Sequence, residues 1–345
     1  MRVACLAIGL SLWAGFWATQ LMALEIEDRR VYPGTGPETL RILSTADLEV
    51  FDPYLRAFQA RRPWVTLDYT VASSTQLHQA IRAGEPFDLA ISSAMDLQFQ
   101  MANDGLARDY ASDRTAALPD WARWRDQVFA FTAEPAVVLL SAERFADLPL
   151  PRTRQDLITL LRDDPERFQG AVGTYDVRIS GLGYLFATQE ARSTDAFWRL
   201  SEVMGRLQPR LFCCSGQMID DVAQGRLAMA YNVLGSYATD RLSQDSGGPV
   251  HILRMQDFAN VMLRTALIPQ AADDPANAGA FIDMLAELAL REDPGEWPLP
   301  PLRQTAEDQP SDFGPIRLGP ALMVYLDPLN RRAFLDEWEN AMEQR

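Results

Sequence analysis

The feature that most constrains the fold is a repeated unit in which a short apolar stretch ends in serine or threonine just before a helical segment. The stretch DLAISSAM at 88–95 shows this order, and it recurs at LRILSTAD (40–47) and LDYTVASST (67–75). A few apolar residues between turn formers are typical of a strand buried on both faces of a parallel sheet. Three such units predict a β-α-β-α array whose right-handed crossovers place the three turns at one edge of the sheet.

The hydroxyl side chains at these turns are candidate ligand contacts. A serine before a helix is by itself an ordinary N-cap, so one such turn indicates no site. Several turns at one edge would direct hydroxyls and free helix N–H groups at a common point, where the helix dipoles favour an anion. His78, in the helix after the second turn, is a secondary candidate, with an ordinary hydrogen-bonded histidine as the alternative. The hydroxyl candidates of this region are Ser44, Thr45, Ser73, Ser74 and Ser93.

The first 23 residues differ from the rest of the chain. Arg2 precedes the apolar run VACLAIGLSLWAGFWA, and TQLMA closes on Ala23 before the acidic LEIEDRR. This order predicts a secretory signal peptide at 1–23 that is cleaved after Ala23, with an uncleaved membrane anchor as the alternative. Cys5 comes before most of the apolar run, which does not suit a lipoprotein signal. We therefore expect a soluble protein of the periplasm.

Composition excludes several chemistries. The net charge of −15 leaves no basic surface for nucleic acid. The chain contains no lysine, which excludes Schiff-base catalysis and a Walker A phosphate loop. With only two histidines, the sequence offers almost nothing for a zinc site or a Ser/His/Asp triad. We expect no metal site, no cofactor and no enzymatic activity.

The second half of the chain adds a fourth turn of the same kind. Residues 131–140 are interpreted as a crossing into a second lobe, and GTYDVRISGLGYLF then gives a strand, a turn and a helix. Arginine can bind a carboxylate or phosphate through two nitrogens, and glycine lets a backbone approach a ligand closely. LAMAYNVLGS at 227–236 is interpreted as a strand that returns to the first lobe. The candidates here are Asp176, Arg178, Ser180 and Gly181 at the turn, and Tyr231 and Asn232 near the polar end of the return strand.

Cys213 and Cys214 are adjacent in the sequence. A disulfide between neighbouring residues closes an eight-membered ring that strains the peptide, so two buried thiols are favoured over a disulfide.

The order of these pieces resembles the type 2 periplasmic solute-binding proteins of ABC transporters, in the branch with ferric-ion, phosphoglycerate and sugar-phosphate binders. The segments that carry the likeness are LRILST, ASSTQLHQAIRAGEPFDLAISSAMD, GTYDVRISGLGYLF, QGRLAMAYNVLGSYA, ALIPQAADDPANAGAFIDMLAE and LGPALMVYLDPLNRRAFLDEW. The resemblance implies a two-lobed α/β fold with two crossing hinge strands, and a solute clamped between the lobes. The expected lobes are 24–132 with 240–300, and 133–239 with 301–345.

The resemblance also implies a role and partners. We expect a monomer that captures a small anionic solute, a phosphorylated or carboxylated metabolite, and delivers it to an ABC permease of the inner membrane. One alternative is a ferric-ion binder, but the tyrosine pair of such proteins is missing here, because Tyr231 is followed by Asn232. The other alternative is a ligand sensor for a membrane histidine kinase.

Overall fold

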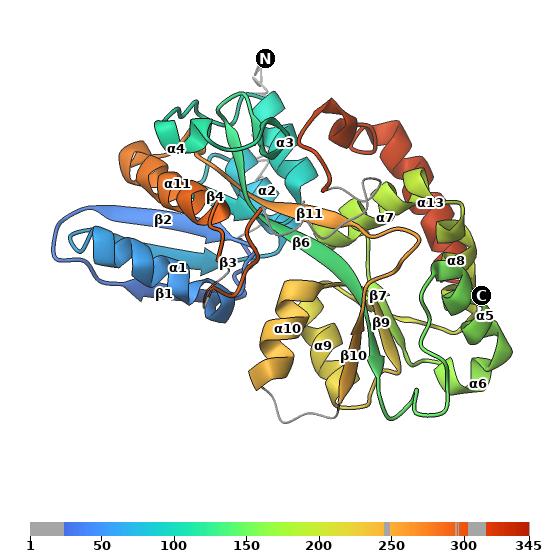
Figure 1. Ribbon diagram of the computed structural model, residues 1–345. Coiled ribbons are helices and arrows are strands. Elements are labelled where there is room, and N and C mark those ends of the chain that lie inside the picture. The colour runs from blue at the N-terminus through green and yellow to red at the C-terminus, as the bar shows by residue number, and fades with distance from the viewer. Residues whose placement is uncertain (1–23, 245–248, 294, 296, 303–314, 345) are drawn as a thin grey trace, which may run out of the picture.

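The computed structural model describes residues 24–244, 249–293, 295, 297–302 and 315–344. The predicted signal peptide at 1–23 therefore lies outside the described residues. Two lobes are joined through the long strand β6 (Val128–Ser141) and its neighbour β11 (Val261–Leu267) (Figure 1). Within the described ranges, no helix combines the length and the apolar character that a membrane span requires.

The first lobe is built on the three predicted strand, turn and helix units. Its strands β3, β2 and β4 are parallel, with Leu43 opposite both Thr70 and Ala90. The antiparallel strand β1 covers one edge of this group, and β11 pairs with β4 at the other. The elements are β1 (Asp28–Tyr32), β2 (Thr39–Ser44), α1 (Leu48–Arg61), β3 (Thr66–Val71), α2 (Ser74–Arg82), β4 (Leu89–Ser92), α3 (Met95–Asn103), α4 (Asp113–Ala116), η1 (Asp120–Ala122), β5 (Arg123–Trp124) and α11 (Pro275–Ala289).

The second lobe repeats the arrangement around the parallel pairs β7–β8 and β7–β9. The C-terminal helix packs on α8 and buries Phe334, Trp338 and Met342 in the core of this lobe. The elements are α5 (Arg154–Asp163), α6 (Pro165–Phe168), β7 (Val172–Tyr175), α7 (Gly181–Ser193), α8 (Ala196–Arg206), β8 (Arg210–Phe212), α9 (Ser215–Ala223), β9 (Met229–Leu234), α10 (Gly235–Gln244), β10 (Val250–Leu253) and α13 (Pro328–Met342). The short helix η2 (Pro320–Met323), which precedes α13 in the chain, contacts α3 of the first lobe.

Strand β6 passes through both lobes, and all of its residues are buried. Its first half pairs with β11, and its second half pairs with β9 and β10. Near its middle, Glu134 accepts two hydrogen bonds from Arg264 of β11, at 2.9 and 3.2 Å, and both side chains are fully buried. Removing one partner of a buried ion pair is strongly destabilising, because the other charge is left unpaired. The pair therefore holds the two crossing strands together at this point.

The two-lobed fold with two crossings is confirmed, but the second crossing lies later in the chain than predicted. The strand expected to return, at 227–236, is β9, which lies between β6 and β7 inside the second lobe. Helix α10 follows at once and packs on α9. The chain reaches the first lobe only after β10, on its way into β11. The residue bounds of the lobes stay a prediction.

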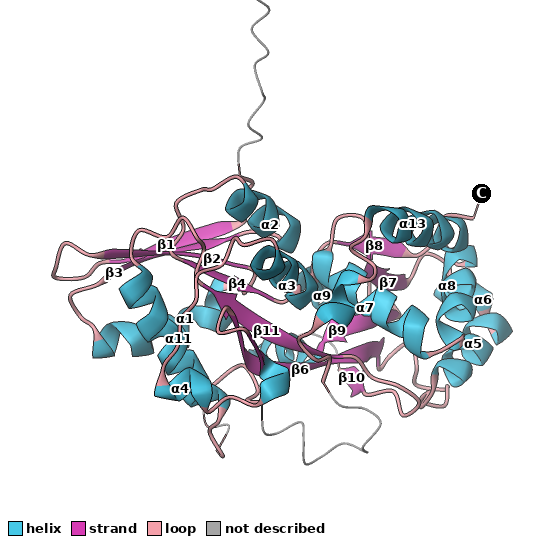
Figure 2. Ribbon diagram, turned by 90° about the horizontal axis from the view of Figure 1, so that it is seen from above, coloured by secondary structure: helices cyan, strands magenta, loops and turns pink. Residues whose placement is uncertain are grey.

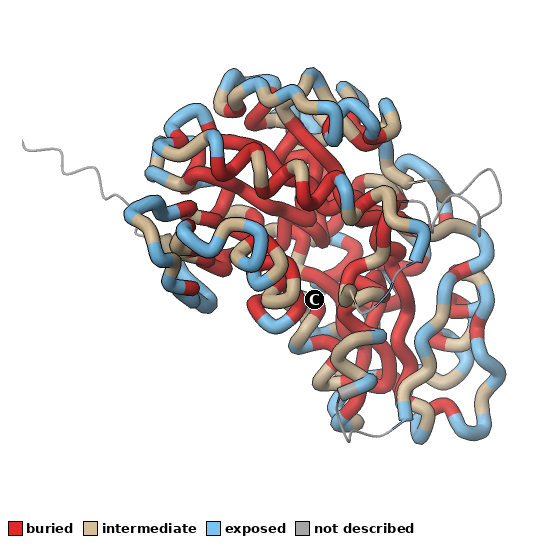
Figure 3. Tube along the Cα trace, turned by 60° about the vertical axis from the view of Figure 1, so that its left-hand side comes forward, coloured by how far each residue is buried: buried red, intermediate tan, exposed pale blue. Residues whose placement is uncertain are grey.

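Buried residues follow the strands through both lobes, and the exposed residues lie on the outer faces of the helices (Figure 3). Seen from above, α2 and α3 of the first lobe face α7 of the second (Figure 2), and these helices are in contact. The sheet edge that carries the hydroxyl turns of the first lobe is therefore turned toward the second lobe.

Candidate functional site

A cleft between the lobes lies where the N-terminal ends of five helices meet. Asp47, Ser73 and Ser93 come at or just before the starts of α1, α2 and α3 of the first lobe, and Ser180 and Cys214 precede α7 and α9 of the second. Each helix start carries free N–H groups and the positive end of a dipole. The lining residues are Glu27, Thr45, Asp47, Ala72, Ser73, Ser74, Ser93, Tyr175, Ser180, Leu182, Cys213, Cys214, Ser215, Gly216, Leu234 and Tyr237.

The hydroxyls of this cleft are arranged as donors. Ser73 Oγ accepts from the backbone N–H of Gln76 at 3.3 Å, and Ser180 Oγ accepts from that of Gly183 at 3.1 Å. Thr45 Oγ1 accepts from the N–H of Ser93 at 3.0 Å. Because each oxygen already accepts a backbone proton, its own O–H proton is left for another acceptor. Two of these hydroxyls have a hydroxyl neighbour: Ser73 Oγ lies 3.1 Å from Thr75 Oγ1, and Thr45 Oγ1 lies 3.3 Å from Ser93 Oγ. A bound anion would accept such protons in place of the hydroxyl neighbour. Such a group of donors suits an anionic oxygen.

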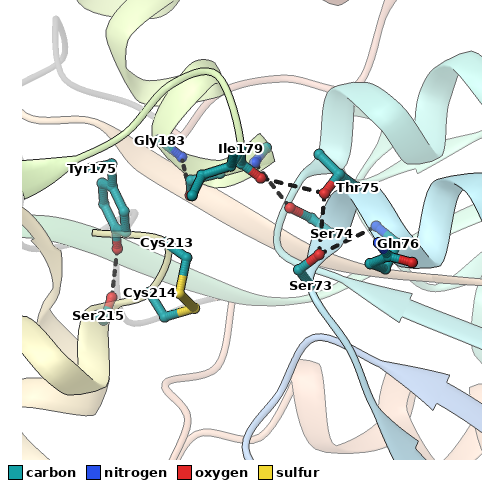
Figure 4. Close-up of a disulfide and its surroundings, with 12 residues drawn as sticks. Ser73, Ser74, Thr75, Gln76, Tyr175, Ile179, Gly183, Cys213, Cys214 and Ser215 are labelled. Carbon is teal, nitrogen blue, oxygen red and sulfur yellow. Dashed lines mark hydrogen bonds between the residues drawn. A yellow bond between two sulfur atoms is a disulfide. The ribbon is translucent and has the colours of Figure 1, made fainter. Parts of the chain in front are cut away.

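Hydrogen bonds between the lobes close the cleft beside these residues. The N–H of Gly181 donates to Ser74 Oγ at 3.0 Å, and Thr75 Oγ1 donates to the carbonyl of Ile179 at 3.3 Å (Figure 4). The space in the cavity that is open to the centres of water molecules is about 60 Å³, which is enough to admit several water molecules. Because hydrogen bonds between the lobes close the cleft, a solute enters only when the lobes move apart.

Two carboxylates share the cleft with the hydroxyls. Burial raises the pKa of Asp47, and the neighbouring Arg264 and Arg241 partly offset that effect. Burial also raises the pKa of Glu27, and the charge of Asp47 adds to the rise. The nearby Arg241 is bound to Asp220, at 2.6 and 2.9 Å. No arginine lines the cleft within the described ranges, so the positive potential in it comes from the helix N-termini.

The structure brings five of the predicted residues together in this cleft, namely Thr45, Ser73, Ser74, Ser93 and Ser180. Ser44 is fully buried beneath it, where its Oγ accepts from the N–H of Ala46 at 3.0 Å. Side chains alternate along a strand, so Ser44 turns into the core and Thr45 toward the cleft.

A second cavity of about 270 Å³ lies beside the first and contains His78, Arg178 and Gly181. Arg178 binds Asp176 at 2.7 Å and Glu343 of the C-terminal tail at 2.6 Å. These two predicted residues therefore pair with each other in the structure. Asp96 also lines this cavity, and burial raises its pKa to about 7.

Tyr231 and Asn232 lie in a third cavity, away from the cleft. The hydroxyl of Tyr231 donates to Glu190 Oε2 at 3.0 Å, and Glu190 in turn binds the buried Arg154. Asn232 has a φ of 63°, in the left-handed region that asparagine tolerates better than most residues. Neither side chain reaches the helix ends that surround the cleft.

The prediction of two free thiols is wrong, because Cys213 and Cys214 form a disulfide. This disulfide lines the cleft together with Ser215, whose Oγ lies 2.5 Å from the hydroxyl of Tyr175. A signal for this turn was present in the sequence, since RLFCCSGQMIDD repeats the order of strand, hydroxyl and helix. Other lining residues that were not among the predicted ligand contacts are Glu27, Asp47 and Tyr237.

Comparison with known proteins gives a family for the chain. A family model described as bacterial extracellular solute-binding protein matches residues 40–292. The substrate-binding protein of an Agrobacterium tumefaciens ABC transporter is 28% identical, with a TM-score of 0.85 over 91% of this chain and 98% of that one. No curated protein sequence matches.

Two further solved structures share the fold at lower identity. The periplasmic binding protein AfuA of Actinobacillus pleuropneumoniae, with fructose 6-phosphate bound, is 16% identical with a TM-score of 0.72 over 90% of this chain and 100% of that one. The iron-bound HitA of Pseudomonas aeruginosa is also 16% identical, with a TM-score of 0.62 over 88% and 99%. The chain belongs to the family of bacterial extracellular solute-binding proteins, of the type that serves ABC transporters.

Proposed function

We propose that the chain captures a small anionic solute, a phosphorylated or carboxylated metabolite, between its lobes and delivers it to an ABC permease of the inner membrane. The observation that carries this proposal is the convergence of five helix N-termini from two lobes on one cleft with donor hydroxyls. In the same proposal, residues 1–23 direct export to the periplasm, where the protein acts as a monomer without turnover.

Several donors must act together for useful affinity. A hydrogen bond to a charged group contributes about 1.5 to 3 kcal/mol, and micromolar binding needs about −8 kcal/mol. About three to six such contacts would reach that value, and the cleft offers the hydroxyls of Thr45, Ser73, Ser93 and Ser180 besides the helix N–H groups. The sugar phosphate in the AfuA structure makes this class of ligand a natural first probe.

The ferric-ion alternative is less well supported. Ferric iron prefers phenolate and carboxylate oxygens held close together. Tyr175 and Tyr237 line the cleft, but burial raises the pKa of both phenols far above neutrality. Among the described residues, no group of three or more His, Cys, Asp or Glu side chains could hold a metal ion. An iron site would therefore need protonated phenols to ionise in a buried setting.

A thermal-shift screen of the purified protein tests the proposal. The probes are phosphorylated acids and sugars of three to six carbons, dicarboxylates and ferric citrate. A ligand at a hundred times its Kd adds about 2.7 kcal/mol of stability, which raises the midpoint by a few degrees. The proposal predicts a shift with one of the organic anions and no loss of that compound over time. A shift with ferric iron alone, together with tyrosinate absorbance, would support the iron binder instead.

The sensor alternative shares the fold and the cleft. A two-component signal transduction protein resembles 72% of the chain with a TM-score of 0.59 at 14% identity. Capture of membrane proteins by the ligand-bound form distinguishes transport from signalling. Recovery of a permease supports transport, and recovery of a histidine kinase supports signalling.

A further inference from the structure

The disulfide between Cys213 and Cys214 occupies an unusual place for a structural cross-link. It joins neighbouring residues between the end of β8 and the start of α9, so it ties no distant parts of the chain together. Both cysteines are half-buried, and both line the cleft between the lobes. In Figure 4 the sulfur atoms lie between Tyr175 and Ser215 of the second lobe and Ser73 of the first. The pair is therefore part of the ligand-facing wall.

The chemistry of this wall differs from that of the rest of the cleft. Most other lining side chains are hydroxyls, phenols or carboxylates, whereas a disulfide is apolar, polarisable and has no proton to donate. The other apolar side chains among the lining residues are Ala72, Leu182 and Leu234. A solute that fits all of these surfaces has an acidic group, several hydroxyls and one face made of C–H groups.

The neighbouring contacts hold the disulfide in place against the cleft. Ser215 follows Cys214 directly, and its Oγ contacts the hydroxyl of Tyr175 and accepts from the N–H of Leu234 at 3.4 Å. Cys214 is also the N-cap residue of α9, without a side-chain capping bond. The sulfur atoms are thus free of a capping role and are available to a ligand.

We propose that the Cys213–Cys214 disulfide is a direct ligand contact that selects phosphorylated sugars and similar cyclic polyol anions, and that reduction of the disulfide weakens their binding. This inference rests on the proposed function. The phosphate binds the hydroxyls and helix ends, Glu27 and Asp47 accept from the sugar hydroxyls, and the C–H face of the ring packs on the two sulfurs. Neither a dithiol nor a pair of alanines offers the same flat apolar surface.

The redox step is a two-electron reduction by a thiol or phosphine reductant. With a dithiol, the S–S bond breaks, each sulfur of the protein takes up one proton, and the reductant gives up two thiol protons and becomes a disulfide. With a phosphine, water supplies the oxygen of the phosphine oxide and the two protons. No other part of the protein gains or loses atoms.

The test compares two ligands in two redox states of the same protein. The chain carries Cys5→Ser, which leaves the adjacent pair as its only cysteines. Titration calorimetry measures the Kd of fructose 6-phosphate and of inorganic phosphate before and after treatment with a phosphine, and mass spectrometry verifies the gain of two hydrogens. We expect reduction to weaken fructose 6-phosphate binding at least ~10-fold and inorganic phosphate binding less than ~3-fold. The double variant Cys213→Ala, Cys214→Ala should bind both ligands with the Kd values of the reduced protein, and treatment with the phosphine should not change them.

Each other outcome overturns the inference in a distinguishable way. Equal affinity for the sugar phosphate in both states removes the disulfide as a contact and leaves the proposed function standing. An equal loss of affinity for both ligands would mean that the disulfide acts by maintaining the shape of α9 and not by contacting the sugar. If neither ligand nor any other organic anion binds the oxidised protein, the proposed function fails together with the inference. Should the double variant not fold, the comparison of redox states in the unsubstituted pair still decides.

Discussion

Replacement of Gly181 by alanine tests the contact that closes the cleft. A Cβ atom at this position would lie 2.5 Å from Ser74 Oγ and 3.1 Å from a methyl carbon of Leu97. The first distance is shorter than real Cβ contacts allow, so Ser74 must rotate away or the lobes must separate. Either movement breaks the hydrogen bond from the N–H of Gly181 to Ser74, and separation also breaks the one from Thr75 to Ile179.

The size of the effect follows from these two bonds. Each contributes about 1 kcal/mol net, so losing one or both costs about 1 to 2 kcal/mol of the free energy of closure. Because the solute is held only when the lobes close, we expect its Kd to rise about 5- to 30-fold. Because the same two bonds are lost on unfolding, the free energy of unfolding measured in urea should fall by no more than about 1 to 2 kcal/mol.

Titration calorimetry with the strongest organic anion from the thermal-shift screen measures the Kd. The matched control is Gly319→Ala, because a Cβ there meets no atom within 4 Å and its backbone is extended, with a φ of 169°. The control should bind like the unsubstituted protein. An unchanged Kd in Gly181→Ala, or an equal loss in both variants, would refute the role given to this contact.

Two further predictions concern buried charge. Burial raises the pKa of Asp96 from 3.8 to about 7, so its contribution to stability is present below pH 4 and is lost as the pH rises through 7. Relative to the unsubstituted protein, the free energy of unfolding of Asp96→Asn in urea should therefore rise by up to about 4 kcal/mol between pH 4 and pH 8. Parallel pH profiles of the two proteins would contradict this. Glu134→Gln should cost about 3 to 5 kcal/mol, because it leaves the charge of Arg264 buried without its partner. Glu287→Gln, which breaks the exposed pair with Arg61, should cost less than about 1 kcal/mol, and equal losses would refute the distinction.

Simple chain geometry made part of the site predictable. The carboxyl ends of parallel strands meet at one edge of a sheet, so the turns that end in Thr45, Ser73 and Ser93 had to come together once the strands were recognised. That Ser180 faces them depends on how the second lobe closes on the first. The resemblance implied that arrangement, whereas the local sequence pattern did not.

The misplaced candidates depended on contacts between distant residues. Arg178 is held by Glu343, which is 165 positions away in the sequence. The hydroxyl of Tyr231 points at Glu190 rather than at the cleft, and which side of β9 it faces follows from the register of a strand whose ends the sequence left open. No spacing rule revealed these partners.

The disulfide shows a different limit. The cost of an eight-membered ring argues against a bond between adjacent cysteines, but Cys213 and Cys214 are bonded in the turn between β8 and α9. Ring strain is one part of the energy of such a turn, and the backbone on either side of the two cysteines is the other.

A crystal structure of the protein with its bound solute tests the central claim most directly. The account predicts an acidic group hydrogen-bonded to Ser73, Ser93 and Ser180 at the helix starts, with both lobes in contact with it. A bound cation or apolar molecule in that cleft, or an anionic solute held by one lobe alone, would contradict the account.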